Sequence, residues 1–395
     1  MTDHPIVRLR PKISATRFRH GHPWAYDNEL VLDRRTKKVA PGTIVELQDS
    51  ERVPLATAAL NTTSRIAVRI LDVPGVAIDQ DWFEAKFRAA LALRERLYSA
   101  PYYRLIHAEG DGMPGVVVDR FGDHLVIQPN AAWAEVHFDA MAAAAVKVTG
   151  ASVVVKNATG RARGLEGLDT ETQVVRGSVT APVPVLMNGA TYMADLLGGQ
   201  KTGLFFDQRD NHAFAARLAK GGRMVDVFSH VGGFSLAALA GGATQALAID
   251  GSAPALALAE EGSRQSGVAD KFSTQKADAF AAMQGLGEKG EAFDLVVCDP
   301  PAFAPAKSAL SAGLRAYEKV ARMGARLVAP GGYLVLCSCS QAASVANFRE
   351  NSLRGIGKSG RKAQIIATGG AGADHPVHPM LAETSYLKSL FLRLN

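Results

Sequence analysis

Strand-like and helix-like patterns alternate through the C-terminal half of the chain, from about residue 183. Short apolar runs, which we interpret as strands, recur at 223–228, 244–250, 271–278, 293–299, 331–338 and 361–368. The segments between them are rich in Ala and Leu and read as helices. Such alternation is typical of a parallel sheet, so we predict an α/β, Rossmann-like domain over residues 183–395. One more apolar run, 386–394, is predicted to be an antiparallel strand at the edge of the sheet.

The first 77 residues have a different pattern, in which apolar and polar residues alternate over short runs. Three such runs are present, at 41–50, 53–61 and 65–72, and Pro-Gly pairs punctuate them. A period of two with frequent turn residues is typical of half-buried β-strands. We therefore predict a small β-barrel over residues 1–77.

Residues 78–182 mix both patterns and are predicted to form an α+β domain. A helix is expected at 81–99, with Phe83, Phe87, Leu91 and Leu93 on its apolar side. The expected elements after it are two strands within 115–129, a helix around 131–147 and a strand at 151–157.

Composition narrows the class of protein. Of the 395 residues, 47% are hydrophobic and 21% are charged, as in a soluble globular protein. The N-terminus lacks the apolar core of a signal peptide, and no run approaches the roughly 18 apolar residues of a membrane span. The three cysteines cannot form a disulfide framework and lack the spacing of zinc ligands. We expect a cytoplasmic protein that holds no metal ion and does not bind a membrane.

Positive charge is concentrated at the N-terminus. Residues 1–38 contain nine Lys and Arg and four Asp and Glu, and this difference of +5 nearly equals the net charge of +6. A basic end on a near-neutral body favours contact with a polyanion such as RNA. A solvated charged face explains the same residues equally well.

Four successive predicted strands have an aspartate at or near their carboxyl end: Asp226, Asp250, Asp278 and Asp299. Each aspartate alone is explained by a loop or a helix cap. The set favours a nucleoside site, because ligands of open α/β sheets bind at the carboxyl ends of the strands and an acid can hold ribose hydroxyls. Gly232 and Gly233 follow the first strand, where glycine lets the backbone approach a ligand.

A further motif discriminates between NAD and S-adenosylmethionine, which share this ribose chemistry. Asp299 is followed by Pro300 and Pro301, which fix φ and hold the acid rigidly at the mouth of the site. Methyltransferases that act on planar nitrogen heterocycles use such a loop to present hydrogen-bonding groups to the base, whereas a dehydrogenase does not need one.

Several motifs occur together in a family's order. They are "RFRHGHPWAYDNEL" (17–30), "KTGLFFDQRDNH" (201–212), "DVFSHVGGFSL" (226–236), "AIDGS" (248–252), "DPPAF" (299–303), "CSCS" (337–340) and "DHPVHP" (374–379) with "YLKSLFLRL" (386–394). On these motifs, the chain resembles the bacterial 23S ribosomal RNA (cytosine-5)-methyltransferases that carry an N-terminal PUA domain. The resemblance covers nearly the whole chain.

The resemblance implies S-adenosyl-L-methionine as cofactor and a set of residues around it. Together with the aspartates above, the predicted cofactor residues are Lys201, Thr202, Phe206, Asp207, Gln208, Arg209, Asp226, Phe228, Ser229, Gly232, Asp250, Ser252, Asp278, Ala279 and Asp299. Asp207 has an alternative interpretation, as the N-cap of a helix that ends at Gly221-Gly222.

The cysteines separate into core residues and a candidate nucleophile. Cys298 and Cys337 lie within apolar runs and are predicted to be buried. Cys339 lies at the carboxyl end of its run, and its Ser-Cys-Ser context resembles the family's catalytic motif. Thiolate addition at C6 would make cytosine C5 nucleophilic, and Asp299 would stabilise the activated base. Ala302 stands where many RNA cytosine-5 enzymes have a second cysteine.

Three functions therefore remain in consideration. The first is a methyltransferase that forms 5-methylcytosine in RNA, with 23S rRNA as the partner. The second is an N-methyltransferase on guanine or adenine, which needs no nucleophile. The third is a non-catalytic RNA-binding or ribosome-assembly factor, against which the retained aspartates and Cys339 argue. The sequence leaves the oligomeric state open, with a homodimer as one option.

Overall fold

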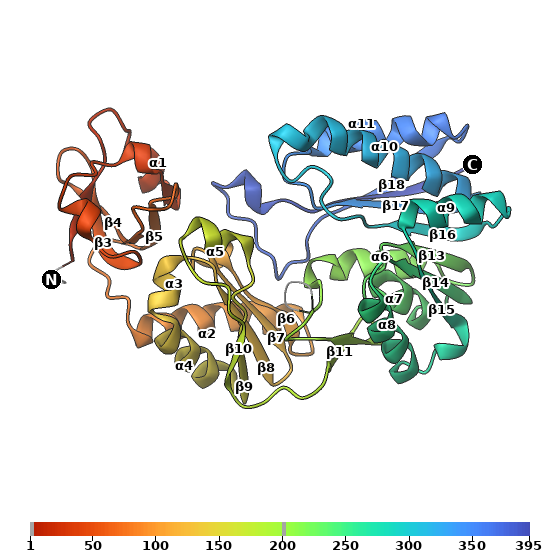
Figure 1. The fold of residues 1–395 in the computed structure, drawn as a ribbon, viewed down its shortest axis with the longest axis horizontal. Helices are drawn as coiled ribbons and strands as arrows, with labels where there is room; N and C mark the ends of the chain where they lie inside the picture. The colour runs from red at the N-terminus through yellow and green to blue at the C-terminus, as the bar shows by residue number, and fades with distance from the viewer. Residues whose placement is uncertain (1–3, 200–202) are drawn as a thin grey trace. The chain divides into compact units, whose positions relative to one another are not determined.

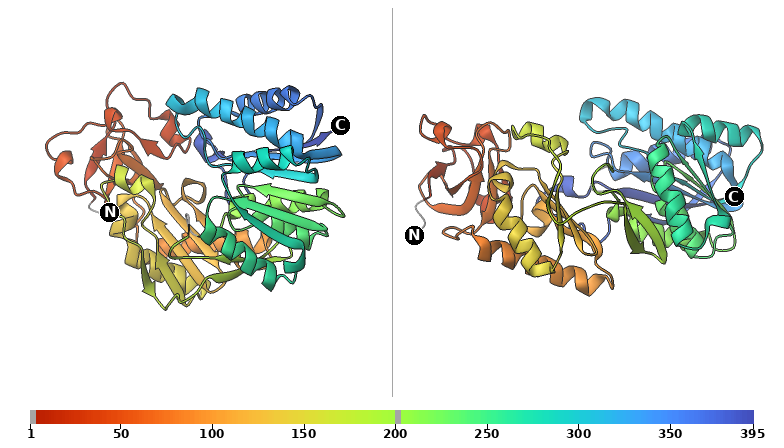
Figure 2. Two further views of the ribbon diagram at one scale, coloured as in Figure 1. Left: turned by 45° about the vertical axis from the view of Figure 1, so that its right-hand side comes forward. Right: turned by 60° about the horizontal axis from the view of Figure 1, so that its bottom comes forward.

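The computed structural model describes residues 4–199 and 203–395, which form two compact units (Figures 1 and 2). The first unit contains Met1–Ala181, a short segment that begins at Leu196, and Ala373–Thr384. The second contains Pro182–Asp195, Gly203–Gly372 and Ser385–Asn395. Within the described residues, no helix is long and apolar enough to cross a membrane.

The first part of unit 1 is a five-stranded sheet in the order β1-β3-β4-β5-β2. Its strands are β1 (Ile6–Arg8), β2 (Trp24–Ala25), β3 (Thr43–Gln48), β4 (Pro54–Leu60) and β5 (Val68–Asp72). The three predicted runs correspond to β3, β4 and β5, and their inward residues, such as Val45, Ala58 and Val68, are fully buried. The two short strands β1 and β2 were not predicted. A one-turn helix, α1 (Thr16–Arg19), lies between them in sequence.

The second part of unit 1 is a five-stranded sheet in the order β10-β9-β8-β7-β6, with helices packed on it. The elements are α2 (Gln80–Leu97), β6 (Tyr102–His107), β7 (Val116–Phe121), β8 (His124–Pro129), α3 (Ala132–Val136), α4 (Phe138–Thr149), β9 (Val153–Lys156), α5 (Arg161–Leu165) and β10 (Gln173–Arg176). The single helix predicted around 131–147 is wrong, because α3 ends at Val136 and α4 begins at Phe138.

Helix α2 also corrects the predicted apolar face. Leu93 is 41% exposed, whereas Arg94 is fully buried on the side that carries Phe83 and Phe87. The Arg94 guanidinium donates to both carboxylate oxygens of Asp111, at 2.6 and 2.7 Å, and to the backbone carbonyl of Asp374 at 2.9 Å. A planar donor fork matches a carboxylate in this way. Arg94 therefore anchors the segment Ala373–Thr384 within unit 1.

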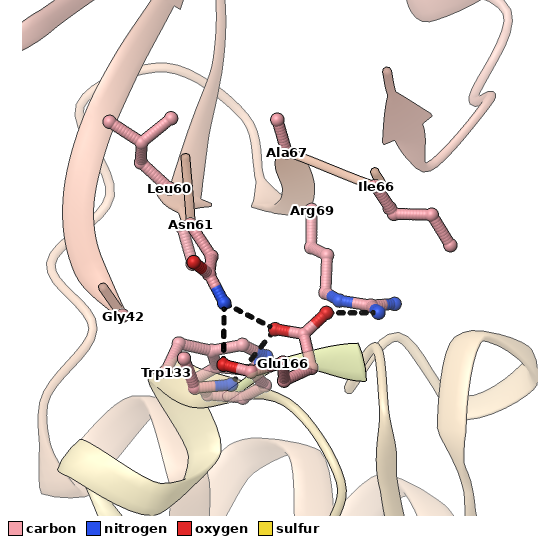
Figure 3. Close-up of a pocket in the computed structure, with 10 residues that line it drawn as sticks. Gly42, Leu60, Asn61, Ile66, Ala67, Arg69, Trp133 and Glu166 are labelled. Atoms are coloured by element: carbon pink, nitrogen blue, oxygen red, sulfur yellow. Dashed lines mark hydrogen bonds and ion pairs between the residues drawn. The ribbon is translucent and has the colours of Figure 1, made fainter. Parts of the chain in front are cut away.

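A buried acid joins the two sheets of unit 1 (Figure 3). The carboxylate of Glu166 accepts from Asn61 at 3.0 Å, from Ser64 at 2.8 Å and from Arg69 at 3.0 Å. Burial alone would raise the pKa of Glu166, but the Arg69 charge and these hydrogen bonds hold the pKa below its usual value. Since Asn61, Ser64 and Arg69 lie in or beside β4 and β5, Glu166 helps to fasten the N-terminal sheet to the rest of the unit, as Glu109 does through Trp24 and Arg69.

Unit 2 begins with a hairpin and continues as a seven-stranded sheet in the order β15-β14-β13-β16-β17-β19-β18. The strands are β11 (Val183–Met187) and β12 (Ala190–Ala194) in the hairpin, then β13 (Arg223–Val227), β14 (Gln245–Asp250), β15 (Phe272–Lys276), β16 (Phe293–Cys298), β17 (Val328–Ser338), β18 (Ala363–Gly369) and β19 (Lys388–Leu394). The predicted antiparallel direction of β19 is confirmed, but its predicted place at the edge is wrong. It pairs with both β17 and β18, and β18 forms the edge.

Helices cover both faces of this sheet (Figure 1). Helices α9 (Ala279–Glu288), α10 (Leu310–Leu327) and α11 (Val345–Lys358) pack against one face. Helices α6 (Arg209–Leu218) and α7 (Gly233–Ala240) pack against the other, and α8 (Ala253–Gln265) follows β14. Alternate strand residues enter the two cores, as a period of two requires. The α/β, Rossmann-like prediction for this region is confirmed.

The strand order determines where a ligand can bind. The chain runs outward from β13 through β14 to β15, and then returns to place β16 on the other side of β13. At such a switch point the loops that follow neighbouring strands diverge and leave a crevice at their carboxyl ends. The loops after β13, β14, β16 and β17 carry six of the predicted site residues: Phe228, Ser229, Gly232, Ser252, Asp299 and Cys339.

Replacing Glu166 tests its role in holding unit 1 together. Glu166→Gln removes the charge that faces Arg69 and should lower the free energy of unfolding by about 2–3 kcal/mol. Urea unfolding followed by tryptophan fluorescence measures this effect, because Trp24, Trp82 and Trp133 all belong to unit 1. Glu171→Gln, at an exposed position, is the matched control and should leave the midpoint unchanged. Equal midpoints for both variants would contradict the anchoring role.

Candidate active site

The loop between β13 and α7 has an unusual backbone. Phe228 and His230 have φ of +65° and +49°, and Gly232 has φ of +78°. The left-handed region is costly for residues with a side chain. At Gly233 the constraint is space and not the backbone angle, because an added Cβ would lie 2.7 Å from the His212 ring. This loop therefore approaches its surroundings so closely that only glycine fits at Gly233.

Asp226 fixes the start of helix α7. It is fully buried, and one carboxylate oxygen accepts from the Ser235 backbone N–H at 3.0 Å and from the Ser235 hydroxyl at 2.9 Å. Burial raises the pKa of Asp226 to about 7, although the Ser235 hydrogen bonds act to lower it. The geometry thus assigns Asp226 a structural role in the loop, and direct contact with a cofactor stays a prediction.

Asp250 organises the next loop through both of its oxygens. Oδ2 accepts from the His230 backbone N–H at 2.8 Å, and Oδ1 accepts from the Ser252 backbone N–H at 2.8 Å. A carboxylate offers about four lone-pair sites, so each oxygen can still accept a ribose hydroxyl. Ser252 itself caps helix α8 by accepting from the Ala255 N–H. Asp250 therefore joins the loops after β13 and β14 at the predicted ribose position.

The acid after β15 behaves as a helix cap. The Asp278 side chain accepts from the Ala281 N–H at 2.9 Å at the start of α9, and Ala279 is the first residue of that helix. Three partly buried aromatic rings lie near this point, those of Phe228, Phe280 and Phe303, with centroids 6.3–6.4 Å apart. Phe280 and Phe303 were not predicted as site residues, although Phe303 closes the "DPPAF" motif.

The "FFDQRDN" block reaches the acid after β16. Gln208 donates to Asp299 Oδ2 at 2.9 Å, and Asn211 donates to Gln208 Oε1 at 2.6 Å. The cap interpretation of Asp207 is wrong, because α6 begins at Arg209 and the N-cap position is Gln208, which makes no side-chain capping bond. Asp207 instead accepts from the Tyr386 hydroxyl at 2.5 Å.

The other predicted residues of this block are Phe206, Arg209, Lys201 and Thr202. Phe206 is buried, and the Arg209 guanidinium lies 5.7 Å from the centroid of its ring. Lys201 and Thr202 lie outside the described residues. Among those that are described, no group of three His, Cys, Asp or Glu side chains is arranged to hold a metal ion.

The three cysteines differ in accessibility as predicted. Cys298 and Cys337 are 0% and 1% exposed and pack into the cores on opposite faces of the sheet. Burial raises the pKa of both thiols well above the usual value. Cys339 is half-buried and lies just beyond Ser338, the last residue of β17. Cys339 is therefore the most accessible of the three cysteines.

Buried hydrogen bonds hold the residues on either side of Cys339. The Ser338 hydroxyl donates to the Tyr317 hydroxyl at 2.8 Å, and the Tyr317 and Ser340 hydroxyls lie 2.7 Å apart. Ser340 Oγ also accepts from the Ala304 N–H at 2.9 Å. Lys388 donates to the backbone carbonyls of Ser340 and Ala343, at 2.7 and 3.0 Å. The loop is thus fixed by α10, by the segment after Pro300-Pro301, and by β19.

Sequence reasoning missed Tyr317 and Lys388. Tyr317 lies in the middle of an ordinary amphipathic helix and gives no signal. Lys388 does give one, since it is a lysine within the apolar run "YLKSLFLRL", and it is only 6% exposed. A charged residue at a strand position of this kind is seldom buried without a function or a partner.

Comparisons with known proteins agree with this architecture. Residues 145–358 match the family model of S-adenosylmethionine-dependent methyltransferases, and residues 7–72 match a PUA-like domain. The chain is 33% identical to ribosomal RNA large subunit methyltransferase I of Erwinia tasmaniensis, over 94% of this chain and 95% of that one. It is also 33% identical to a ribosomal RNA large subunit methyltransferase of Deinococcus radiodurans, over 99% and 98% of the two chains.

The chain belongs to the S-adenosylmethionine-dependent methyltransferase family.

Solved structures show the same fold at lower sequence similarity. The methyltransferase SMU.776, crystallised with SAH, superposes with a TM-score of 0.82 at 20% identity and covers 98% of this chain and 99% of its own. An S-adenosylmethionine-dependent methyltransferase from Streptococcus mutans gives a TM-score of 0.81 at 19% identity, over 98% and 100% of the two chains.

The residues present fit the cofactor of this methyltransferase family. Ser229 is 4% exposed, and its buried hydroxyl has no hydrogen-bond partner among the described residues, whereas buried polar groups normally have one. It lies in the same loop as Gly232 and Gly233 and beside Asp250. S-adenosylmethionine carries ribose hydroxyls and a charged amino-acid group. These groups can form hydrogen bonds with the Ser229 hydroxyl and the Asp250 carboxylate.

Cofactor affinity tests the placement of Asp250. Asp250→Ala should weaken binding of S-adenosylmethionine by about 1.5–3 kcal/mol, the range for hydrogen bonds to a charged group. Isothermal titration calorimetry measures the change. Asp270→Ala removes an exposed acid from the same unit and should bind as the wild type does. Wild-type affinity in Asp250→Ala would exclude Asp250 from the cofactor site.

Proposed function

We propose that this methyltransferase forms 5-methylcytosine in ribosomal RNA through a covalent intermediate on Cys339. The observation that carries the proposal is the geometry of β16 and β17, which pair side by side with Cys298 opposite Leu336. Asp299 follows Cys298, and Cys339 lies three residues beyond Leu336. One acid and the only accessible thiol thus follow neighbouring strands at the same end of the sheet.

The chemistry requires a nucleophile because C5 of cytosine is too electron-poor to accept a methyl group directly. The Cys339 thiolate adds to C6, which gives C5 the character of an enamine carbon. The cofactor supplies the methyl group that C5 accepts. A base or water then takes the C5 proton, the C5–C6 double bond re-forms and the C6–S bond breaks, which regenerates the Cys339 thiolate.

Asp299 is placed to bind the base while this happens. Its orientation is set by the Gln208 hydrogen bond and by the two prolines that follow it. A carboxyl group in this position can hydrogen-bond the exocyclic amine or N3 of cytosine and stabilise the adduct. Gln208 is in turn held by Asn211, which also donates to the carbonyl of Gly370 at 3.0 Å.

The substrate class rests on the names of the relatives and on the N-terminal charge. Both relatives are named for methylation of large-subunit ribosomal RNA, and PUA-like domains bind structured RNA. We propose the same substrate here, with a target cytosine that can be unstacked. An enzyme of ribosomal RNA works where ribosomes assemble, which agrees with the expected cytoplasmic location.

Six of the nine N-terminal bases fall into two groups that differ in their ion pairing. Arg17 forms an ion pair with Glu29, and Arg19 pairs with Asp49 at 2.8 Å. Four further bases, Arg34, Arg35, Lys37 and Lys38, are exposed, and within the described part of the chain none of them pairs with an acid. Asp33 fixes this segment by accepting from the Arg35 and Thr36 N–H groups. The second group is the better candidate for binding phosphates.

Replacement of Cys339 tests the nucleophile. Cys339→Ser should abolish methyl transfer and leave cofactor binding nearly intact, because a hydroxyl is far less ionised than a thiol near neutral pH. Wild-type protein with RNA that carries 5-fluorocytidine should form a covalent adduct on a denaturing gel, since fluorine cannot leave as the C5 proton does.

The matched control is Cys337→Ser, which alters a buried thiol on the same strand. This variant should be less stable but should still form the adduct. Methyl transfer by Cys339→Ser, together with no adduct from the wild type, would contradict the proposal and favour N-methylation of guanine or adenine.

Salt dependence tests the RNA-binding segment. Replacing Arg34, Arg35, Lys37 and Lys38 by Gln should flatten the plot of log affinity against log salt, by about 0.7–0.9 for each phosphate that the variant no longer neutralises. Filter binding or fluorescence anisotropy with ribosomal RNA fragments measures this slope.

A control set with the same charge change is available in unit 2. Lys220, Lys271, Lys289 and Lys362 are exposed and precede β13, β15, β16 and β18, at the end of the sheet opposite the site. Replacing these four by Gln should leave the slope unchanged. An equal effect of both sets would mean that the N-terminal bases form only a solvated face.

A further inference from the structure

Lys388 lies directly beside the Cys339 loop. It is the first residue of β19 and pairs with Ser338, the last residue of β17. Directly opposite residues of an antiparallel pair share one face of the sheet. The Lys388 ammonium reaches past the end of β17 and donates to the carbonyl of Ser340 at 2.7 Å. Its contacts therefore involve both residues that flank Cys339.

The ammonium group is buried without a carboxylate. Lys388 is 6% exposed, and within residues 4–199 and 203–395 it forms no ion pair with an acid. Its two hydrogen bonds go to neutral backbone carbonyls, of Ser340 and Ala343. An ammonium has three donors, and a buried charge is costly unless an opposite charge compensates it. The site therefore favours a negative group near Lys388.

Cys339 is the group that can supply this charge. Burial lowers the pKa of Lys388, and the charge of Cys339 acts in the opposite direction. Tyr317, from α10, also interacts with Cys339 electrostatically, and burial raises the pKa of this phenol, so that it stays neutral near pH 7. Asp299, from the loop after β16, acts on the neighbouring thiol of Cys337. Of Tyr317, Asp299 and Lys388, Lys388 is the one that carries a positive charge.

We propose that the buried ammonium of Lys388 stabilises the thiolate of Cys339 and so prepares it for addition to the base. The proposal rests on the proposed function of Cys339 and gives Lys388 a positioning role, since Lys388 acts through the cysteine. The S–H bond of Cys339 breaks, its proton leaves to solvent, and the product is a thiolate beside the ammonium that Lys388 already carries. No other bond is formed or broken.

Two features of the site support this role over a merely structural one. The carbonyls of Ser340 and Ala343 need only a hydrogen-bond donor, which a neutral side chain or a water molecule could provide at lower cost. A cation, in contrast, lowers the pKa of a neighbouring thiol, as it does in other reactive cysteines. The hydrogen bonds of Tyr317 and Ser340 also hold this loop, so Lys388 is not its only support.

The thiol titration of Cys339 in the free full-length protein tests the proposal. Iodoacetamide alkylation is followed as a function of pH, and mass spectrometry of the Cys339 peptide separates it from the buried Cys298 and Cys337. The wild type should show a midpoint below the ordinary thiol value of about 8.5. Lys388→Gln and Lys388→Met should raise that midpoint by about one pH unit or more, so that alkylation at pH 7 becomes about tenfold slower.

Two controls separate charge from loop geometry. Lys388→Arg keeps the charge and should retain a midpoint near that of the wild type. Ser340→Ala loosens the same loop without removing charge and should leave the midpoint in place. Circular dichroism reports whether each variant is folded.

Each outcome has a distinct meaning. A wild-type midpoint at or above about 8.5 would overturn the proposal even if the Lys388 variants failed to fold. An unshifted midpoint in folded Lys388→Gln would also overturn it, and would leave the role of Cys339 intact. Methyl transfer by Cys339→Ser would instead contradict the proposed function, whatever the titration shows.

Discussion

The antiparallel pairing of β19 with β17 is the constraint on which the candidate site depends. Strands β16 and β17 are parallel, so their carboxyl ends lie at the same end of the sheet. Because β19 runs in the opposite direction, its first residue lies at that same end. Asp299, Cys339 and Lys388 are thereby brought from three neighbouring strands to one place. A β19 parallel to β17 would place Lys388 at the far end of the sheet.

The other half of the crevice is built from acids that bind backbone N–H groups. Asp226 holds the first turn of α7, and Asp250 joins the loops after β13 and β14. These interactions stabilise a loop with two non-glycine residues at positive φ. Such strain persists only where the surrounding structure determines it, and it is common at binding sites. The aspartates of β13 and β14 in this way determine the conformation of the loop.

The sequence was most informative where periodicity and strand order act together. Alternation predicted the strands of the large sheet, and aspartates at strand ends located the crevice. Prediction failed where tertiary contacts decide: β19 is inserted between β17 and β18, Arg94 replaces Leu93 on a buried face, and Asp207 bonds Tyr386 instead of capping α6. Lys388 and Tyr317 approach Cys339 only through folding, so no local pattern in the sequence links them.

The central claim is that methylation occurs at C5 of cytosine through Cys339. Measuring the release of the C5 hydrogen tests this claim most directly. Ribosomal RNA labelled with tritium at C5 of cytidine is incubated with the protein and S-adenosylmethionine, and tritium in water is compared with methyl groups in RNA. The account predicts one tritium released for each methyl group transferred, and none with Cys339→Ser. Methyl incorporation without tritium release would contradict it.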